Sequence, residues 1–98
     1  MSSTEVVKSP LAVVCATVIK VGYEDFVKLM EVFRPRGATV VRGKVRTGVL
    51  GKGKEVLILI HGSIAYVHPV EKGEEVVITP DVEVEDLRFC SELGALGL

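Results

Sequence analysis

Residues 23–46, YEDFVKLMEVFRPRGATVVRGKVR, change from one hydrophobic period to another, and this change decides which secondary structures we expect. Large apolar residues first recur at i, i+3, i+4 and i+7, the spacing of one helix face: Phe26, Leu29, Met30 and Phe33. Pro35 then ends the predicted helix, residues 23–33, because the helical conformation is disfavoured for a residue that precedes proline. From residue 38 the pattern alternates with a period of two, which is typical of a strand.

The segments around this stretch predict further strands. Residues 11–21 are rich in β-branched residues and almost continuously apolar, so we expect a central strand there. Residues 38–47 and 56–60 flank a glycine-rich connection, which predicts a β-hairpin. Further elements are expected in the C-terminal half: strands at 64–67, 75–79 and 81–85, and a short helix at 86–93. The whole predicts an α+β fold in which one amphipathic helix packs on a mainly antiparallel sheet or small β-barrel, in the order β-α-β-β-β-β.

The composition is that of one ordinary globular domain, residues 1–98, with disordered tails expected at residues 1–9 and 95–98. No apolar run reaches the ~18–20 residues that a membrane helix needs, and the N-terminus lacks a secretory-signal pattern. We therefore expect a cytoplasmic protein with no membrane partner. The absence of Asn and Gln, alongside abundant Lys, Arg and Glu, is typical of thermophilic proteins.

No pattern of catalytic, metal-binding or cofactor-binding residues is visible, so no cofactor is expected. Cys15 and Cys90 both stand in apolar surroundings, which predicts buried free thiols, with a disulfide between them as the alternative. His61 and His68 are seven residues apart and would point to opposite faces of a continuous strand, which disfavours a shared metal site.

The feature that points to a function is a run of basic residues. Residues 34–54 hold seven basic residues and no acidic one: Arg34, Arg36, Arg42, Lys44, Arg46, Lys52 and Lys54. The run predicts an anionic partner, and its part 48–54 (GVLGKGK) matches the first positions of the phosphate-binding loop GxxxxGK. Glu55 stands where that loop needs Ser or Thr, so nucleotide hydrolysis is disfavoured.

The middle of this run has two interpretations. Basic side chains at alternate positions of one strand would share a face and meet successive phosphates: Arg42, Lys44 and Arg46. Alternatively, an acidic strand of the same spacing would lie beside them and neutralise them as cross-strand pairs, within the chain or between subunits: Asp81, Glu83 and Glu85.

Several short segments resemble PUA domains, which are small RNA-binding barrels. The segments that carry the resemblance are 37–43 (GATVVRG), 51–56 (GKGKEV), 64–66 (IAY) and 72–76 (KGEEV). The resemblance covers about residues 20–80. It implies that RNA lies against the helix and the glycine-containing loop that follows it, with these contacts: Arg34, Arg36, Gly37 and Ala38.

We therefore expect a non-enzymatic nucleic-acid-binding module, with RNA favoured over DNA. Its seven basic residues and Gly37 would contact phosphates, which sets affinity but not sequence preference. The alternative is a structural or assembly subunit, possible as a homo-oligomer, in which the basic strand pairs with the acidic one. A metabolic enzyme is a third hypothesis, because active sites can be assembled from residues far apart in sequence.

Overall fold

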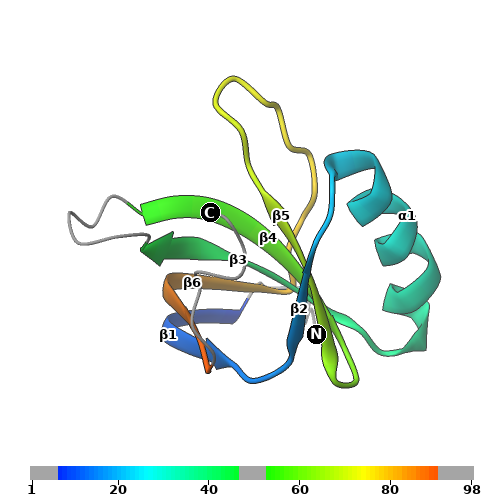
Figure 1. Cartoon of the computed structure of the whole chain (residues 1–98), viewed down its shortest axis with the longest axis horizontal. Helices are drawn as coiled ribbons and strands as arrows, with labels where there is room; N and C mark the ends of the chain where they lie inside the picture. Colours follow the sequence, from blue (N-terminus) through cyan, green and yellow to red (C-terminus); the bar gives the residue numbers. More distant parts are fainter. Residues whose placement is uncertain (1–6, 47–52, 91–98) are drawn as a thin grey trace, which may run out of the picture.

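The computed structural model describes residues 7–46 and 53–90, which form an α-helix, a 3-10 turn and six strands (Figure 1). In chain order these elements are β1 (Val7–Val14), β2 (Thr17–Lys20), α1 (Tyr23–Phe33), η1 (Arg34–Arg36), β3 (Thr39–Arg46), β4 (Gly53–His61), β5 (Ile64–Pro69) and β6 (Val82–Phe89). The helix has the bounds that the hydrophobic period predicts. Its first turn holds Glu24 and Asp25, where negative charge favours the positive end of the helix dipole.

The strands form one mixed sheet in the order β1-β6-β3-β4-β5-β2. β3 pairs antiparallel with β4, and β4 with β5, as the predicted hairpin requires. β1 and β3 both pair parallel with β6, and β2 pairs parallel with β5. The α+β class is thus confirmed, but the mainly antiparallel sheet is wrong, because β6 returns along the direction of β1 and β3 after the long connection at residues 70–81.

The predicted central strand at residues 11–21 is instead two strands, which lie at opposite ends of the strand order. Only Cys15 and Ala16 separate β1 from β2, so the sheet must curl until its edges approach each other, which gives the half-barrel of Figure 1. A disulfide joins Cys15 to Cys90 beyond the end of β6. The expectation of buried free thiols is therefore wrong, since both cysteines are bonded and exposed.

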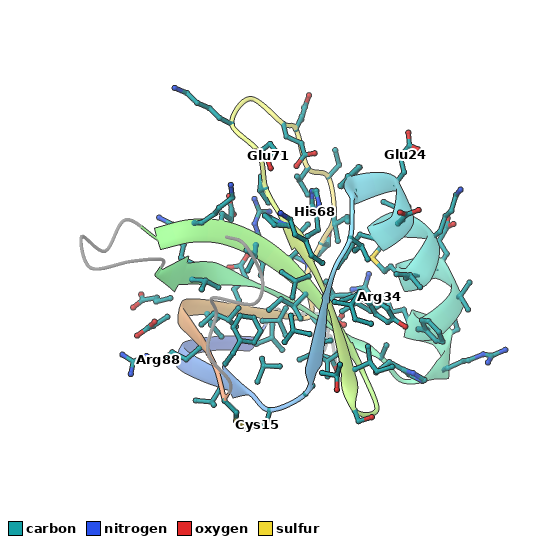
Figure 2. The ribbon with its side chains drawn as sticks, viewed as in Figure 1. Cys15, Glu24, Arg34, His68, Glu71 and Arg88 are labelled. Atoms are coloured by element: carbon teal, nitrogen blue, oxygen red, sulfur yellow. A yellow bond between two sulfur atoms is a disulfide. The ribbon has the colours of Figure 1, made fainter. Side chains whose placement is uncertain are left out.

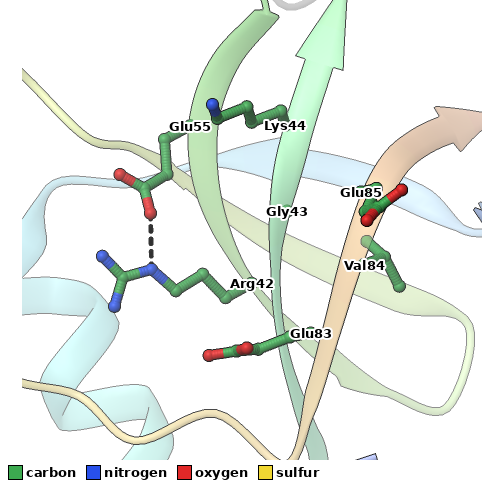
Figure 3. A pocket seen from close by; sticks show the side chains of 7 residues that line it. All are labelled: Arg42, Gly43, Lys44, Glu55, Glu83, Val84 and Glu85. Carbon is green, nitrogen blue, oxygen red and sulfur yellow. Dashed lines mark hydrogen bonds and ion pairs between the residues drawn. The ribbon is translucent and has the colours of Figure 1, made fainter. Parts of the chain in front are cut away.

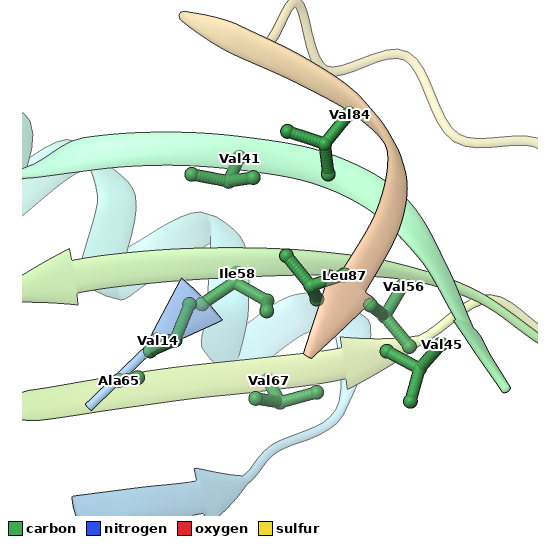
Figure 4. Close-up of a cluster of buried hydrophobic side chains, with 9 residues drawn as sticks. All are labelled: Val14, Val41, Val45, Val56, Ile58, Ala65, Val67, Val84 and Leu87. Atoms are coloured by element: carbon green, nitrogen blue, oxygen red, sulfur yellow. The ribbon is translucent and has the colours of Figure 1, made fainter. Parts of the chain in front are cut away.

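The two faces of the sheet pack into two cores. Inside the curl, side chains from β1, β3, β4, β5 and β6 meet in a core dominated by valine (Figure 4): Val14, Val41, Val45, Val56, Ile58, Ala65, Val67, Val84 and Leu87. On the outer face, α1 packs on β4 and β5, and Phe26 is completely buried between them. Neighbours along β3 alternate between the two cores, since Val40 belongs to the outer core and Val41 to the inner one.

Three predicted segment boundaries are wrong. The segment 86–89 belongs to β6 instead of a helix. Its backbone pairs with β1 on one side and with β3 on the other, and Leu87 is buried in the inner core. Residues 75–79 form no strand, and β1 begins at Val7, inside the predicted tail. Residues 95–98 lie outside the described part of the chain.

Within the described residues, no helix is long and apolar enough to cross a membrane.

Candidate functional site

The predicted basic run is divided between the two ends of β3. Arg36 precedes the strand at one end, and Lys44 lies near the other. A strand rises about 3.3 Å per residue, so the part of β3 from Thr39 to Lys44 alone spans roughly 16 Å. The cations that are consecutive in the sequence therefore cannot form a single patch, and each end of β3 has its own surroundings.

At the far end of β3, a groove of about 360 Å³ opens on the outer face of the sheet (Figure 3). Its lining comes from β3, β4 and β6: Arg42, Gly43, Lys44, Glu55, Glu83, Val84 and Glu85. We call it the charged groove. It holds three carboxylates and two cations, so a surface that the sequence predicted to be basic carries more acids than bases among its lining residues.

Strand register explains why opposite charges meet in the charged groove. The antiparallel β3–β4 pairing places Lys44 opposite Glu55, and the parallel β3–β6 pairing places Arg42 opposite Glu83. The Arg42 guanidinium also forms an ion pair with Glu55 (Figure 3). Arg42 thus lies beside Glu83 of the predicted acidic strand, but its ion pair is with Glu55 of β4, and Asp81 just before β6 pairs with Arg34 instead.

Gly43 allows β6 to come close to β3 at this groove. A Cβ atom at this position would lie 2.4 Å from Val84 Cγ2 and 3.2 Å from the Val84 carbonyl oxygen. The β3–β6 register shifts between Arg42 and Val45, across this glycine. Three steps along β3 correspond to four along β6 across this shift, and the extra residue of β6 lets both Val84 and Leu87 reach the inner core.

At the near end of β3, Arg34 is bound within the protein (Figure 2). Its guanidinium donates to Asp81 Oδ1 at 2.7 Å and to the Thr79 carbonyl at 2.9 Å. Asp81 Oδ2 accepts from the Val40 N–H at 3.1 Å. Burial by itself raises the pKa of Asp81, but the hydrogen bonds from Arg34 and Val40, with the Arg34 charge, outweigh it and lower that pKa. Arg34 therefore fastens the end of the 70–81 connection to the start of β3.

Among the described residues, the others that were predicted to contact phosphate have weaker interactions within the protein than Arg34 and Arg42. Lys54 lies 3.8 Å from Glu71, an exposed pair of little energetic consequence. Arg36 and Lys44 are exposed, and within the described part of the chain neither forms an ion pair. Gly37 has a left-handed backbone, with φ of 97°, and ends η1 beside Arg36. The Arg46 side chain, Lys52 and the loop 47–52 lie outside the described residues.

Our sequence analysis did not predict a group of aromatic rings at the C-terminal end of α1. Phe33 stacks on His61, with ring centroids 4.6 Å apart and planes 24° apart. Phe33 also stacks with Tyr66 at 6.1 Å and 9°. The three rings come from α1, β4 and β5 and are half-buried. We call Phe33, His61 and Tyr66 the aromatic corner.

The second histidine has a different environment, under the 70–81 connection (Figure 2). His68 is 4% exposed and packs near Tyr23 and Phe26 of α1. Its Nε2 lies 2.8 Å from Glu74 Oε1, and its Nδ1 lies 3.3 Å from the Val21 carbonyl. The hydrogen bond with His68 lowers the pKa of Glu74, against a smaller opposing effect of burial. The spacing of seven residues predicted that His61 and His68 point to opposite faces of one strand. That prediction is wrong, because the β4–β5 turn lies between them and puts both histidines on the helix side of the sheet.

Neither a metal site nor a relative defines a function. Among the residues that the structure describes, no group of three or more His, Cys, Asp or Glu side chains could hold a metal ion. Comparison of the chain with protein-family models, curated proteins and solved structures finds no match. A functional proposal therefore depends on the surfaces of this molecule alone.

Proposed function

We propose that the protein is a non-enzymatic nucleic-acid-binding module, with RNA as its favoured ligand. The observation that carries the proposal is Arg36, an exposed cation without a carboxylate partner among the described residues, which lies three residues after Phe33, one of three stacked aromatic rings. A cation for phosphate and aromatic faces for bases are the two features that single-strand-binding surfaces combine.

The structural environment of each cation supports a division of roles. Arg36 is the proposed phosphate contact at the aromatic corner, and the exposed Lys44 extends the contact at the other end of β3. Arg34 holds the corner in place through Asp81. Arg42 contributes less, because binding phosphate would require it to give up its ion pair with Glu55. The resemblance to PUA domains implies RNA contacts at this same corner, after the helix.

The test is a titration of the protein with labelled single-stranded RNA at ~50 and ~200 mM salt. For single strands log K falls with log salt at about 0.7 per phosphate contact, so a ten-fold loss corresponds to between two and three contacts. We expect a loss of that size for the wild type and a slope smaller by about 0.7 for Arg36→Ala. Arg88→Ala is the matched control, since Arg88 is exposed and pairs with Asp86. Absence of binding at the lower salt overturns the proposal.

A second candidate, an assembly subunit, is favoured by one observation. The charged groove presents exposed Lys44 on β3 and exposed Glu85 on β6, so one surface carries both signs. A twofold axis could place each sign of such a surface opposite the other in a second copy. This candidate predicts an oligomer that dissociates at high salt and that Lys44→Glu disrupts. A particle mass that stays monomeric at low salt excludes it.

A further inference from the structure

We infer that the aromatic corner binds one unpaired nucleobase, so that the protein selects single-stranded RNA over duplex RNA. This inference rests on the proposed nucleic-acid function and names the feature of the ligand that the site recognises. Its basis is the geometry of Phe33, His61 and Tyr66 and the place of Arg36 three residues after Phe33.

The rings have the orientation that stacking requires. The Phe33 plane is within 24° of His61 and within 9° of Tyr66, so the three planes are close to parallel. A base that continues this arrangement adds its face to the same series without a change in the protein backbone. Each ring is half-buried, which leaves part of it accessible while packing keeps it in position. Stacking of this kind tolerates any base, because every base has a π-face.

Arg36 is the exposed basic residue that follows Phe33 of the aromatic corner most closely along the chain. Phe33 precedes η1, and Arg36 is its last residue. In a 3-10 helix the side chains at i and i+3 lie on the same side, separated by about 6 Å of rise. Arg36 therefore projects on the side of Phe33, and Gly37 turns the chain away directly afterwards.

The surroundings of the rings favour a base over a charged or purely apolar partner. The β4–β5 hairpin that carries His61 and Tyr66 has no charged residue between positions 56 and 70. Its turn, Gly62 and Ser63, is exposed. Within the described part of the chain, the His61 ring and the Tyr66 hydroxyl make no hydrogen bond, so both can donate to or accept from the edge of a base.

A tyrosine fluorescence measurement tests the contact directly. The chain has two tyrosines and no tryptophan, so Tyr23→Phe leaves Tyr66 as the sole emitter and Tyr66→Phe leaves Tyr23. Both variants keep an aromatic ring, so both are expected to fold. Addition of a single-stranded RNA octamer should quench Tyr66 in the first variant and leave Tyr23 unchanged in the second. Equal responses of the two tyrosines, or none while the RNA is bound, overturn the inference.

Affinity measurements separate this inference from the function on which it rests. Tyr66→Leu and His61→Ala should each weaken single-stranded RNA binding five-fold or more and change duplex binding little. Tyr23→Leu is the matched control, because Tyr23 is also half-buried at the helix–sheet core and lies near the other histidine. Wild-type affinity in both corner variants, with weakened binding in Arg36→Ala, overturns the base contact alone. If the wild type binds no RNA at ~50 mM salt, the proposed function fails with it.

Discussion

The two ends of β3 carry cations from one run of sequence in opposite electrostatic settings. In the charged groove, Arg42 and Lys44 face three carboxylates from β4 and β6. Arg36, three residues after Phe33 of the aromatic corner, has no carboxylate partner among the described residues. The difference teaches that a basic strand becomes a basic surface only if its neighbouring strands supply no acids. Here the neighbour β6 lies some forty positions further along the chain and could not be paired with β3 by local patterns.

The two ends also depend on different interactions for their shape. The groove end depends on the approach of β6 to β3 at Gly43, and the Cys15–Cys90 disulfide ties the end of β6 to the bend between β1 and β2. The corner end depends on the Arg34–Asp81 pair and its hydrogen bonds. Each set can therefore be broken while the other stays intact, which allows their contributions to be measured separately.

Removal of the disulfide should have the largest effect. A cross-link between residues 75 positions apart stabilises the protein by about 4 kcal/mol in the chain-entropy model. We expect the variant Cys15→Ala/Cys90→Ala to lose unfolding free energy of that order in a denaturant titration. Reductant should lower the midpoint of the wild type and leave the variant unchanged. A wild type indifferent to reductant would contradict the prediction. RNA affinity of the folded variant should stay within two-fold of wild type, because the aromatic corner is built from other elements.

Substitution of Gly43 should have the next largest effect. Gly43→Ala puts a Cβ where Val84 Cγ2 and the Val84 carbonyl already lie, and overpacking of this kind costs about 1–3 kcal/mol. Gly22→Ser is the control, since a Cβ there meets nothing within 4 Å and serine is a good residue before a helix. We expect denaturation midpoints to fall for Gly43→Ala and to stay level or rise for Gly22→Ser. Equal midpoints would mean that β6 can move away from β3 without loss.

Local patterns in the sequence predicted the elements whose partners are close along the chain. The bounds of α1 follow from its apolar period and Pro35, and the β3–β4 hairpin follows from two strands around a glycine-rich connection. The β1–β2 break was invisible because Cys15 and Ala16 continue an apolar run, and only the curl of the sheet makes them a bend. Residues 86–89 looked helical because their pairing with two parallel strands depends on segments far earlier in the chain.

The candidate site shows the same division. The end of the helix before Pro35 was predicted from the residues, and the glycine-containing loop after it was implied by the resemblance to PUA domains. The aromatic corner was not, because Phe33, His61 and Tyr66 are spread over 33 positions and meet only when α1 lies across the hairpin. A signal did exist: the Gly62–Ser63 turn pairs His61 with Ile64 and Leu59 with Tyr66, which makes His61 and Tyr66 diagonal neighbours on one face of the hairpin.

Acidification should have the smallest effect on stability. It compares the Arg34–Asp81 pair at the aromatic-corner end of β3 with the His68–Glu74 contact. The pKa values of Asp81 and Glu74 are both lowered, from ordinary values of 3.8 and 4.5. The unfolded chain then binds protons before the folded one, so stability from both groups is full above these values and is lost as pH falls below them. The range from about pH 5 to pH 3 includes the ordinary pKa values of both groups. Over this range the thermal midpoint of the wild type should therefore fall more steeply than that of Asp81→Asn or Glu74→Gln. Each variant keeps an acceptor oxygen and serves as control for the other. A variant whose midpoint falls as steeply as that of the wild type would show that its carboxylate contributes no acid-sensitive stability. Identical curves for all three proteins would mean that the Arg34–Asp81 pair and the His68–Glu74 contact do not differ in this respect.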